Sequence, residues 1–478
     1  METVAQIIHS LMGVMSALVI LMLVYQLVIS FFGFKRNTKD YRDFPPKQRF
    51  LVLVPAHNEE TVIADIINCL KNMDYPKELY DFYILADNCE DRTADVARQM
   101  GAKVLEIFKE SEDAPTGKPI VLQKALCLLE GYQNCYDMVM FFDADNLVDP
   151  NMFLEVNSQY LSHEGKVDII QCYLGSKNKK GIVACSYFMT FTIINRFFQY
   201  SKSRLGLNCG IGGTGFAVSA SYLYNRGGWT AMSLTEDFEL QIEATCDGKR
   251  ILWNHNVRIY DEKPTKIMAS FRQRTRWAQG NWFVTFKNTA RLFRAFKNKQ
   301  VPFGEFSSTL MCMYSLIPYI ILAAQMVLGL ILNVFEWTRL VVPSDTQIPL
   351  ENWFTLMPSL LLFLYSSLIL FYVGDHMDNG NRFNLRMLVT VILGVLLNMV
   401  VITLAQVVGL FRYRHQNDWH KTEHSINCLS EPTLLPWETG RMSPTSAKPL
   451  DFSMEEPLQL TVEEQTIQFV TGGAEKTA

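Results

Sequence analysis

The sequence predicts an α/β domain with a mostly parallel sheet, inserted between hydrophobic helices. Four runs of the 478-residue chain carry no charged residue, and each could cross a hydrocarbon layer of about 30 Å. These runs are 3–34, 306–335, 352–374 and 387–411. The stretch between the first two alternates short apolar, β-branched runs with helical periods. Such alternation is typical of a parallel sheet with helices on both faces.

The expected elements follow one another closely in the first half of this stretch. Strands are predicted within 49–60, where the strand ends in a polar loop, and within 80–88, 102–108 and 136–146, and helices within 61–73, 92–100 and 119–132. Farther along we expect a strand at 167–173, a long helix from about 183 to 204, a glycine-rich segment at 209–219 and a helix beginning near 234. Ligands bind at the carboxyl ends of the strands in such sheets, where the polar clusters HNEE, ADNCED and DADN lie.

Composition and charge divide the chain into regions. We expect an N-terminal transmembrane helix (1–34), a globular α/β domain (45–265), amphipathic interface helices (266–300), a C-terminal transmembrane region (306–411) and a partly disordered tail (412–478). Six Lys and Arg residues between 35 and 49 predict a cytosolic domain in a multi-pass protein of the plasma membrane. Ten cysteines without framework spacing fit reduced thiols, and a net charge of −4 does not indicate nucleic acid binding.

The C-terminal topology conflicts with a simple count of spans. Three spans after residue 305 would place the basic stretch 412–421 outside the cell, against the positive-inside rule. Either one hydrophobic segment is interfacial or re-entrant, or Pro318 divides the run 306–335 into unequal pieces. We expect a cytosolic tail.

Three acidic clusters are candidates for chemistry. Asp143 and Asp145 lie two apart at the end of a hydrophobic strand, where two carboxylates suit Mg²⁺ or Mn²⁺, although an isolated D-x-D is more often a solvated turn. Asp87 ends another strand and is placed either to accept hydrogen bonds from a base or ribose or to open an Asx turn. Asp237, in TED, either caps a helix or takes a proton from an incoming hydroxyl.

The segment FRQRTRWAQGNW (271–282) joins cations to aromatic rings just before a hydrophobic run. In a helix, Gln273, Arg276 and Trp277 share one face, which offers phosphate donors beside a platform for a sugar ring. A basic juxtamembrane helix would explain the other cations but not this one-sided grouping.

In sequence order, the motifs are VPAHNEE, a strand-end Asp, Gly117–Lys118, D-x-D, G-T-G, T-E-D and Q-x-x-R-W, and membrane spans follow them. The order of these motifs resembles the inverting glycosyltransferase family 2. The similarity is to its membrane-embedded, processive branch of cellulose, hyaluronan and poly-N-acetylglucosamine synthases, and it covers about residues 45–300. It implies a GT-A (Rossmann-like) cytosolic domain, Mg²⁺ or Mn²⁺, a UDP-sugar donor, a growing polysaccharide acceptor and surrounding membrane lipids.

The resemblance also implies roles for particular residues. Asp237, with Glu236 beside it, would be the catalytic base, and Asp145 with Asp143 would hold the metal. Trp277 and the segment Gly213, Thr214 and Gly215, next to Gly212, would meet the acceptor. The donor-binding residues would be Ala56, Glu59, Asp87, Lys118, Asp143, Gln273 and Arg276.

The sequence is compatible with two functions. The first is a polymer synthase using a UDP-sugar, with UDP-glucose slightly favoured over UDP-N-acetylglucosamine. The second is a glycolipid synthase that transfers one sugar to a membrane lipid. A transporter with an inactive cytosolic domain is disfavoured because all the acidic residues are intact. Oligomeric state is not predicted.

Overall fold

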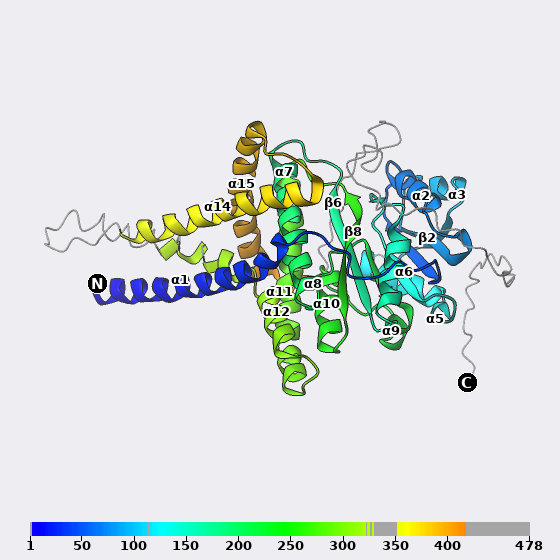
Figure 1. The fold of residues 1–478 in the computed structure, drawn as a ribbon, viewed down its shortest axis with the longest axis horizontal. Coiled ribbons are helices and arrows are strands. Elements are labelled where there is room, and N and C mark those ends of the chain that lie inside the picture. The colour runs from blue at the N-terminus through cyan, green and yellow to red at the C-terminus, as the bar shows by residue number, and fades with distance from the viewer. Residues whose placement is uncertain (1, 112–114, 322, 326, 329–350, 417–478) are drawn as a thin grey trace, which may run out of the picture. The chain divides into compact units, whose positions relative to one another are not determined.

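The computed structural model of the chain describes all residues except 1, 112–114, 322, 326, 329–350 and 417–478 (Figure 1). Its centre is an eight-stranded sheet in the order β3-β2-β1-β4-β7-β6-β8-β5. The strands are β1 Phe50–Ala56, β2 Tyr80–Asp87, β3 Lys103–Ile107, β4 Met138–Phe141, β5 Leu147–Val148, β6 Ile169–Ser176, β7 Phe216–Ser219 and β8 Ile251–Asp261.

The sheet is mostly parallel, as predicted, but β7 and the short β5 run against the other six strands. The first four strands in spatial order run parallel, as predicted, but β7 is antiparallel to both β4 and β6. β8 is parallel to β6, and the short β5 is antiparallel to β8. The strands β7 and β8 were not predicted from the sequence. β7 follows directly from a glycine-rich segment, and polar residues interrupt the apolar pattern of β8. Two reversals leave β6 and β8 pointing the same way as β4, so the carboxyl ends of all these strands share one edge.

Helices cover both faces of the sheet, as predicted. Alternate residues of β1 enter different hydrophobic clusters: Val52 packs with α2 (Ile63–Lys71), α3 (Thr93–Gln99) and α6 (Met152–Ser162). Leu53 packs on the other side with α4 (Lys118–Leu128), α5 (Tyr132–Cys135), α9 (Ala220–Asn225) and α10 (Glu236–Cys246). This period of two is what a strand buried on both faces requires.

The long helix expected at about 183–204 is present but not uniform. It begins as α7 (Ile182–Ile193), continues as a π-helical segment (Ile194–Tyr200) and ends as α8 (Ser201–Arg204). The π-helical segment carries Arg196, which is fully buried and pairs with Asp378. A π-helical turn inside an α-helix often marks a site with a special task, and here it aims a buried cation at another element.

The remaining helices follow the hydrophobic pattern. They are α1 (Glu2–Phe31), α11 (Ile267–Lys297), α12 (Phe303–Met313), α14 (Glu351–Asn379) and α15 (Leu385–Arg412). The predicted interface helices are a single helix, α11. Among the described residues, two helices are long and apolar enough to cross a membrane, Ser10–Phe34 and Met387–Arg412. The run that begins near 306 is broken between Met313 and Ile317 with a 40° bend, ahead of Pro318.

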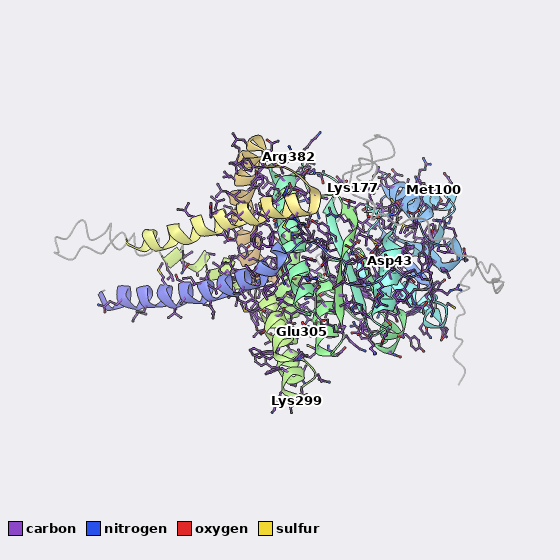
Figure 2. The ribbon with its side chains drawn as sticks, viewed as in Figure 1. Asp43, Met100, Lys177, Lys299, Glu305 and Arg382 are labelled. Carbon is purple, nitrogen blue, oxygen red and sulfur yellow. The ribbon has the colours of Figure 1, made fainter. Side chains whose placement is uncertain are left out.

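Asp378 joins the end of α14 to the sheet through a buried polar network. Its carboxylate accepts from Arg196 and lies 3.0 Å from His255 Nε2, and Tyr173 donates to it at 3.3 Å. Arg258 of β8 donates to the Asp378 carbonyl at 2.7 Å. A buried cation needs such a carboxylate, so this network fixes α14 on β6 and β8. Figure 2 shows the side chains over the ribbon. Residues 417–478, most of the predicted disordered tail, lie outside the described residues.

Candidate active site

The loops after β1 and β2 interlock at the carboxyl edge of the sheet. Asp87 is buried at the end of β2, and its side chain accepts from Asn88 Nδ2 at 2.5 Å. His57 Nδ1 donates to the Asp87 carbonyl at 2.6 Å, next to Ala56 at the end of β1. Burial raises the pKa of Asp87, and the hydrogen bond from Asn88 opposes that shift. An acid held in this way can accept hydrogen bonds from a ligand laid over the strand ends.

Glu59 belongs to the same loop cluster. It is buried, and its backbone amide donates to Thr93 Oγ1 at 2.7 Å, at the start of α3. Asn58, in the left-handed region at φ 55°, accepts from the Glu90 amide at 2.7 Å. Ala56, Glu59 and Asp87 therefore lie at the ends of the adjacent strands β1 and β2 or in the loop that follows β1.

The D-x-D turn is fixed by a residue that sequence reasoning missed. Asn146 Oδ1 accepts from the Asp143 amide at 3.0 Å and from the Thr214 hydroxyl. Asp145 is buried and accepts from the Glu262 amide, after β8, at 2.8 Å. The Asp143 side chain is 40% exposed, so it can meet a ligand from outside. The last letter of DADN was the only sequence signal for the part played by Asn146.

Lys118 connects the D-x-D turn with the acidic start of α10. Its Nζ donates to Asp143 Oδ1 and to the Gly213 carbonyl, both at 2.6 Å, and lies 3.7 Å from Glu236 Oε1. Burial by itself would lower the pKa of the Lys118 ammonium, but Asp143 and Glu236 outweigh it and raise the pKa. One cation thus balances carboxylates from two separate motifs.

Glu236 and Asp237 form the first turn of α10. Burial, and then the charge of Glu236, raise the pKa of Asp237 to about 7, against the Phe238 amide, Lys118 and Arg276. Burial also raises the pKa of Glu236, while Lys118 opposes it. A carboxyl with a pKa near neutrality can take a proton at cellular pH, which is the property of a general base.

The glycines of G-G-T-G are required by protein contacts. Gly213 has φ +81°, and a Cβ there would lie 3.2 Å from Asp237 Oδ2. A Cβ at Gly215, φ +63°, would lie 2.9 Å from Ile259 of β8. Thr214, expected beside the acceptor, is buried with its hydroxyl directed to Asn146. This segment brings its backbone close to Asp237 because side chains are absent there.

Helix α11 lies against the loop that precedes α10. Arg276 Nη1 donates to the Leu234 carbonyl at 3.4 Å, and its charge lowers the pKa values of both Glu236 and Asp237. A second residue that sequence reasoning missed, Gly280, makes this contact possible. A Cβ on Gly280 would lie 2.5 Å from Thr235 Oγ1 and 2.8 Å from the Thr235 amide nitrogen. Its signal was a glycine one helical turn after Arg276 and Trp277.

Gln273 and Trp277 occupy the same helix. Gln273 Oε1 is buried and has no hydrogen-bond partner within the part of the chain that the structure describes. The Trp277 ring meets Tyr187 of α7 edge-on, with ring centroids 6.1 Å apart. The structure therefore brings Arg276 to the acidic pair and places Trp277 at the contact of α11 with α7.

The carboxylates of Asp143 and Asp145 suit a hard divalent cation that is also coordinated by groups outside the protein. Asp143 and Asp145 supply carboxylate oxygens, which Mg²⁺ and Mn²⁺ prefer. No group of three or more His, Cys, Asp or Glu able to hold a metal ion occurs among the described residues. Two carboxylates fit an ion whose remaining ligands are water and phosphate oxygens.

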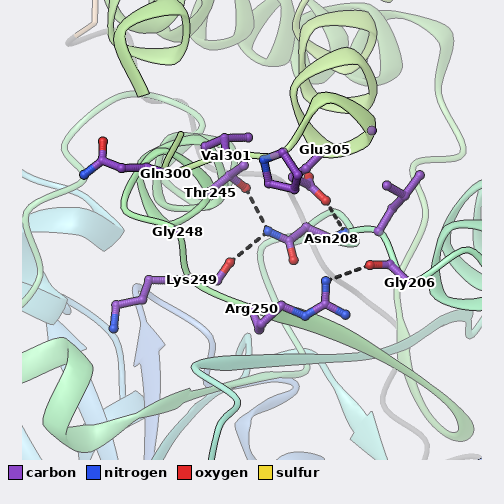
Figure 3. A pocket seen from close by; sticks show the side chains of 12 residues that line it. Gly206, Asn208, Thr245, Gly248, Lys249, Arg250, Gln300, Val301 and Glu305 are labelled. Carbon is purple, nitrogen blue, oxygen red and sulfur yellow. Dashed lines mark hydrogen bonds between the residues drawn. The ribbon is translucent and has the colours of Figure 1, made fainter. Parts of the chain in front are cut away.

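A separate cleft of about 190 Å³ lies between the end of α10 and the α11–α12 turn (Figure 3). Asn208 is at its centre. Its side-chain Nδ2 donates to the Lys249 carbonyl at 2.9 Å, and its backbone amide donates to the Glu305 carboxylate at 2.7 Å. None of the site residues predicted from the sequence lines this cleft.

The fold and the order of the site motifs define a glycosyltransferase, and residues 45–280 match the model of the family described as "Glycosyltransferase like family 2". The chain carries a family 2 glycosyltransferase domain and is a transferase enzyme.

Curated relatives differ in what their names say they make. The chain is 27% identical to the probable glycosyltransferase YdaM of Bacillus subtilis, covering 62% of this chain and 72% of that protein. It is 30% identical to a β-monoglucosyldiacylglycerol synthase of Trichormus variabilis, covering 48% of each. It is 23% identical to a poly-β-1,6-N-acetyl-D-glucosamine synthase of Staphylococcus aureus, covering 52% of this chain and 58% of that protein. The chain thus spans about half the length of several relatives it matches.

Among solved structures, the fold is similar to a mannosyltransferase from Pyrobaculum calidifontis in complex with GDP-mannose and Mn²⁺. The TM-score is 0.53 at 14% identity, covering 87% of this chain and 99% of that one. This likeness shows a GT-A-like α/β fold.

Proposed function

We propose that this protein is a membrane-embedded, inverting β-glycosyltransferase that transfers a sugar from a UDP-sugar to an acceptor hydroxyl. The observation that carries the proposal is the buried acidic start of α10, where Lys118 Nζ lies 3.7 Å from Glu236 Oε1 and burial raises the pKa of Asp237 to about 7. This turn is connected through Lys118 to Asp143 of the D-x-D turn. A proton acceptor and a phosphate- and metal-binding turn are thus joined by one cation.

The reaction is a single displacement at C1 of the donor sugar. The acceptor hydroxyl gives its proton to Asp237 while its oxygen forms the new bond to C1. The bond from C1 to the diphosphate oxygen breaks, and UDP leaves with that electron pair. Arg276 and Gln273 hold the departing diphosphate, so the developing negative charge meets a fixed cation. An α-linked donor then becomes a β-linked product.

The donor lies along the carboxyl edge of the sheet. Ala56, Glu59 and Asp87 bind the uridine. Asp143 and Asp145 would hold Mg²⁺ or Mn²⁺, which would supply positive charge that stabilises the leaving group. Lys118 keeps Asp143 in place and balances Glu236. Of the two donor sugars, UDP-glucose is slightly favoured over UDP-N-acetylglucosamine.

The acceptor we propose is the end of a growing polysaccharide, which stacks on Trp277 and leaves through the neighbouring hydrophobic helices. A membrane lipid is the second candidate. One relative, which is 30% identical, is named as a β-monoglucosyldiacylglycerol synthase, and this name favours a lipid acceptor. The relative named as a polymer synthase is 23% identical.

We further propose that residues 412–416 lie on the cytosolic side together with the catalytic domain. The end of α14 contacts β8, so the chain has returned to the domain before α15 begins. Gly394 of α15 lies against Ser186 of α7, and Gly409 lies against Ala278 of α11. Contacts along α15 with one domain support a cytosolic tail in a plasma-membrane protein.

Release of UDP by the purified, reconstituted protein tests the proposal. A panel of UDP-sugars is offered with Mg²⁺ or Mn²⁺, and the product is then sized. Turnover with one donor and a high-molecular-weight, glycosidase-sensitive product is expected. A small, organic-extractable product would move the acceptor to a lipid, and absence of turnover with every UDP-sugar would contradict the donor class.

A further inference from the structure

The end of α15 packs directly on α11 beside the Q-x-x-R-W residues. A Cβ on Gly409 would lie 2.4 Å from the Ala278 Cβ, so the two helices cross with no room for a side chain. One turn later, Gln279 Nε2 donates to the carbonyls of Arg412 at 3.4 Å and His415 at 3.2 Å. This places the segment 413–416 over the helix that carries Arg276.

Gln416 extends from this segment to the loop that carries the catalytic acids. Its Oε1 accepts from the buried Leu234 amide at 2.9 Å, and its Nε2 donates to the Tyr413 carbonyl at 2.6 Å. The Leu234 carbonyl accepts from Arg276 at 3.4 Å. Leu234 is therefore held on one side by α11 and on the other by the segment that follows α15.

The loop before α10 is also held by buried side chains, because Trp229 and Ala231 pack in the core. The Ser233 amide donates to Glu239 at 2.8 Å, and Thr235, which lies against Gly280, makes no side-chain capping bond to α10. Loss of Gln416 would leave a buried amide two residues before Glu236 unpaired, and the loop would shift to solvate it. Such a shift would move Asp237. A displacement of about 1 Å at a reacting group can lower the rate by about 10²-fold.

From these contacts we propose that Gln416 is a positioning residue for Asp237, so that the last hydrophobic helix of the chain sets the geometry of the catalytic loop. The expected effect on kcat rests on the proposed function, whereas the hydrogen bond between Gln416 and Leu234 does not. Gln416 bonds to Leu234, Tyr413 and the Gln279 carbonyl, and the proposed effect on Asp237 is transmitted through Leu234.

The test replaces Gln416 by methionine, which keeps the length of the side chain but removes its amide. Arg414→Met is the matched control, because Arg414 is exposed in the same segment and its side chain donates to the hydroxyl of the adjacent Tyr413 at 2.9 Å. We expect Gln416→Met to lower kcat for UDP release at least tenfold with a much smaller effect on KM for the UDP-sugar, because the loops after β1 and β2, where the uridine is proposed to bind, are elsewhere. Hydrogen–deuterium exchange should rise within 230–240 in Gln416→Met alone.

The two readouts separate failure of this inference from failure of the proposed function. Equal exchange and equal kcat in the Gln416→Met and wild-type proteins would overturn the positioning role. A fall in kcat matched by an equal fall in UDP-sugar affinity and in folded fraction would also overturn it, since that is general destabilisation. If the wild type turns over no UDP-sugar, the proposed function fails, while the exchange experiment still decides whether Gln416 holds the loop.

Discussion

The two halves of the site are built differently. On the donor side, Asp87 and Asp143 follow directly from strand ends, and their partners Asn88 and Asn146 are one and three residues away. At the start of α10, Asp237 depends on residues from distant parts of the chain, such as Lys118 and Arg276. The comparison teaches that strand ends bring the proposed donor-binding acids into position with nearby partners, whereas the pKa of the proposed proton acceptor depends mainly on elements that are distant along the chain.

The strongest test of this comparison removes the proton acceptor itself. Asp237→Asn keeps the shape of the side chain but cannot take a proton, so we expect kcat to fall by about 10³-fold or more, near the upper range for general base catalysis. UDP-sugar binding, followed by calorimetry, should be retained because the donor side is untouched. Asp247→Asn at the far end of α10 is the control, and turnover retained in Asp237→Asn would remove Asp237 as the base.

Removal of the cation between the two halves should have the next largest effect. Lys118→Met leaves Asp143 and Glu236 without their shared partner, and we expect UDP release to slow by about 10²-fold, as for loss of a charged active-site donor. Lys124→Met, on the same helix and paired with Glu110 at the surface, is the control. A variant as active as the control would show that the halves act independently.

The pH dependence of turnover sharpens the same point. With a pKa of about 7, Asp237 is protonated at lower pH, so kcat/KM should fall about tenfold for each pH unit below that value. Lys118 lowers the pKa of Asp237, so Lys118→Met should move the inflection to higher pH. An inflection near pH 4, the usual value for an Asp, would contradict the environment described.

The same raised pKa has a consequence for stability. Because the folded pKa of Asp237 exceeds the ordinary 3.8, its contribution is fully present below about pH 3.8 and is lost as pH rises through about 7. Thermal unfolding of Asp237→Asn should lack this part of the pH dependence.

The smallest effect concerns the contact of α11 with the loop. Gly280→Ala places a Cβ 2.5 Å from Thr235 Oγ1, so the helix or loop must move; overpacking of this kind costs about 1–3 kcal/mol. We expect kcat to fall by about tenfold with less effect on donor binding. In Gly304→Ala the new Cβ lies 3.6 Å from Leu207, an ordinary contact, and this control should behave as the wild type.

The sequence allowed much of the donor side to be predicted and less of the rest. Strand periodicity locates Ala56, Asp87 and the D-x-D because each follows its own strand. Gly280 and Gln416 could not be assigned, because their importance lies in contacts with Thr235 and Leu234, which are distant along the chain. The strand β8 was missed for a related reason.

In β8, polar residues such as His255 and Arg258 interrupt the hydrophobic pattern on which strand prediction depends. Both belong to the buried network around Asp378, a residue more than 100 positions later. Their burial is therefore a property of the tertiary structure, and local periodicity does not reveal it.

That network bears on how the enzyme can be handled in the laboratory. A fragment that stops after α11 retains Arg196, His255 and Arg258 but lacks the carboxylate of Asp378 that they surround. Burying these groups without it is costly, so the catalytic domain should not be obtainable as a stable soluble truncation. The polypeptide must be made through α14 before its globular part is complete, which makes full-length material in detergent the practical starting point for crystallisation or assay.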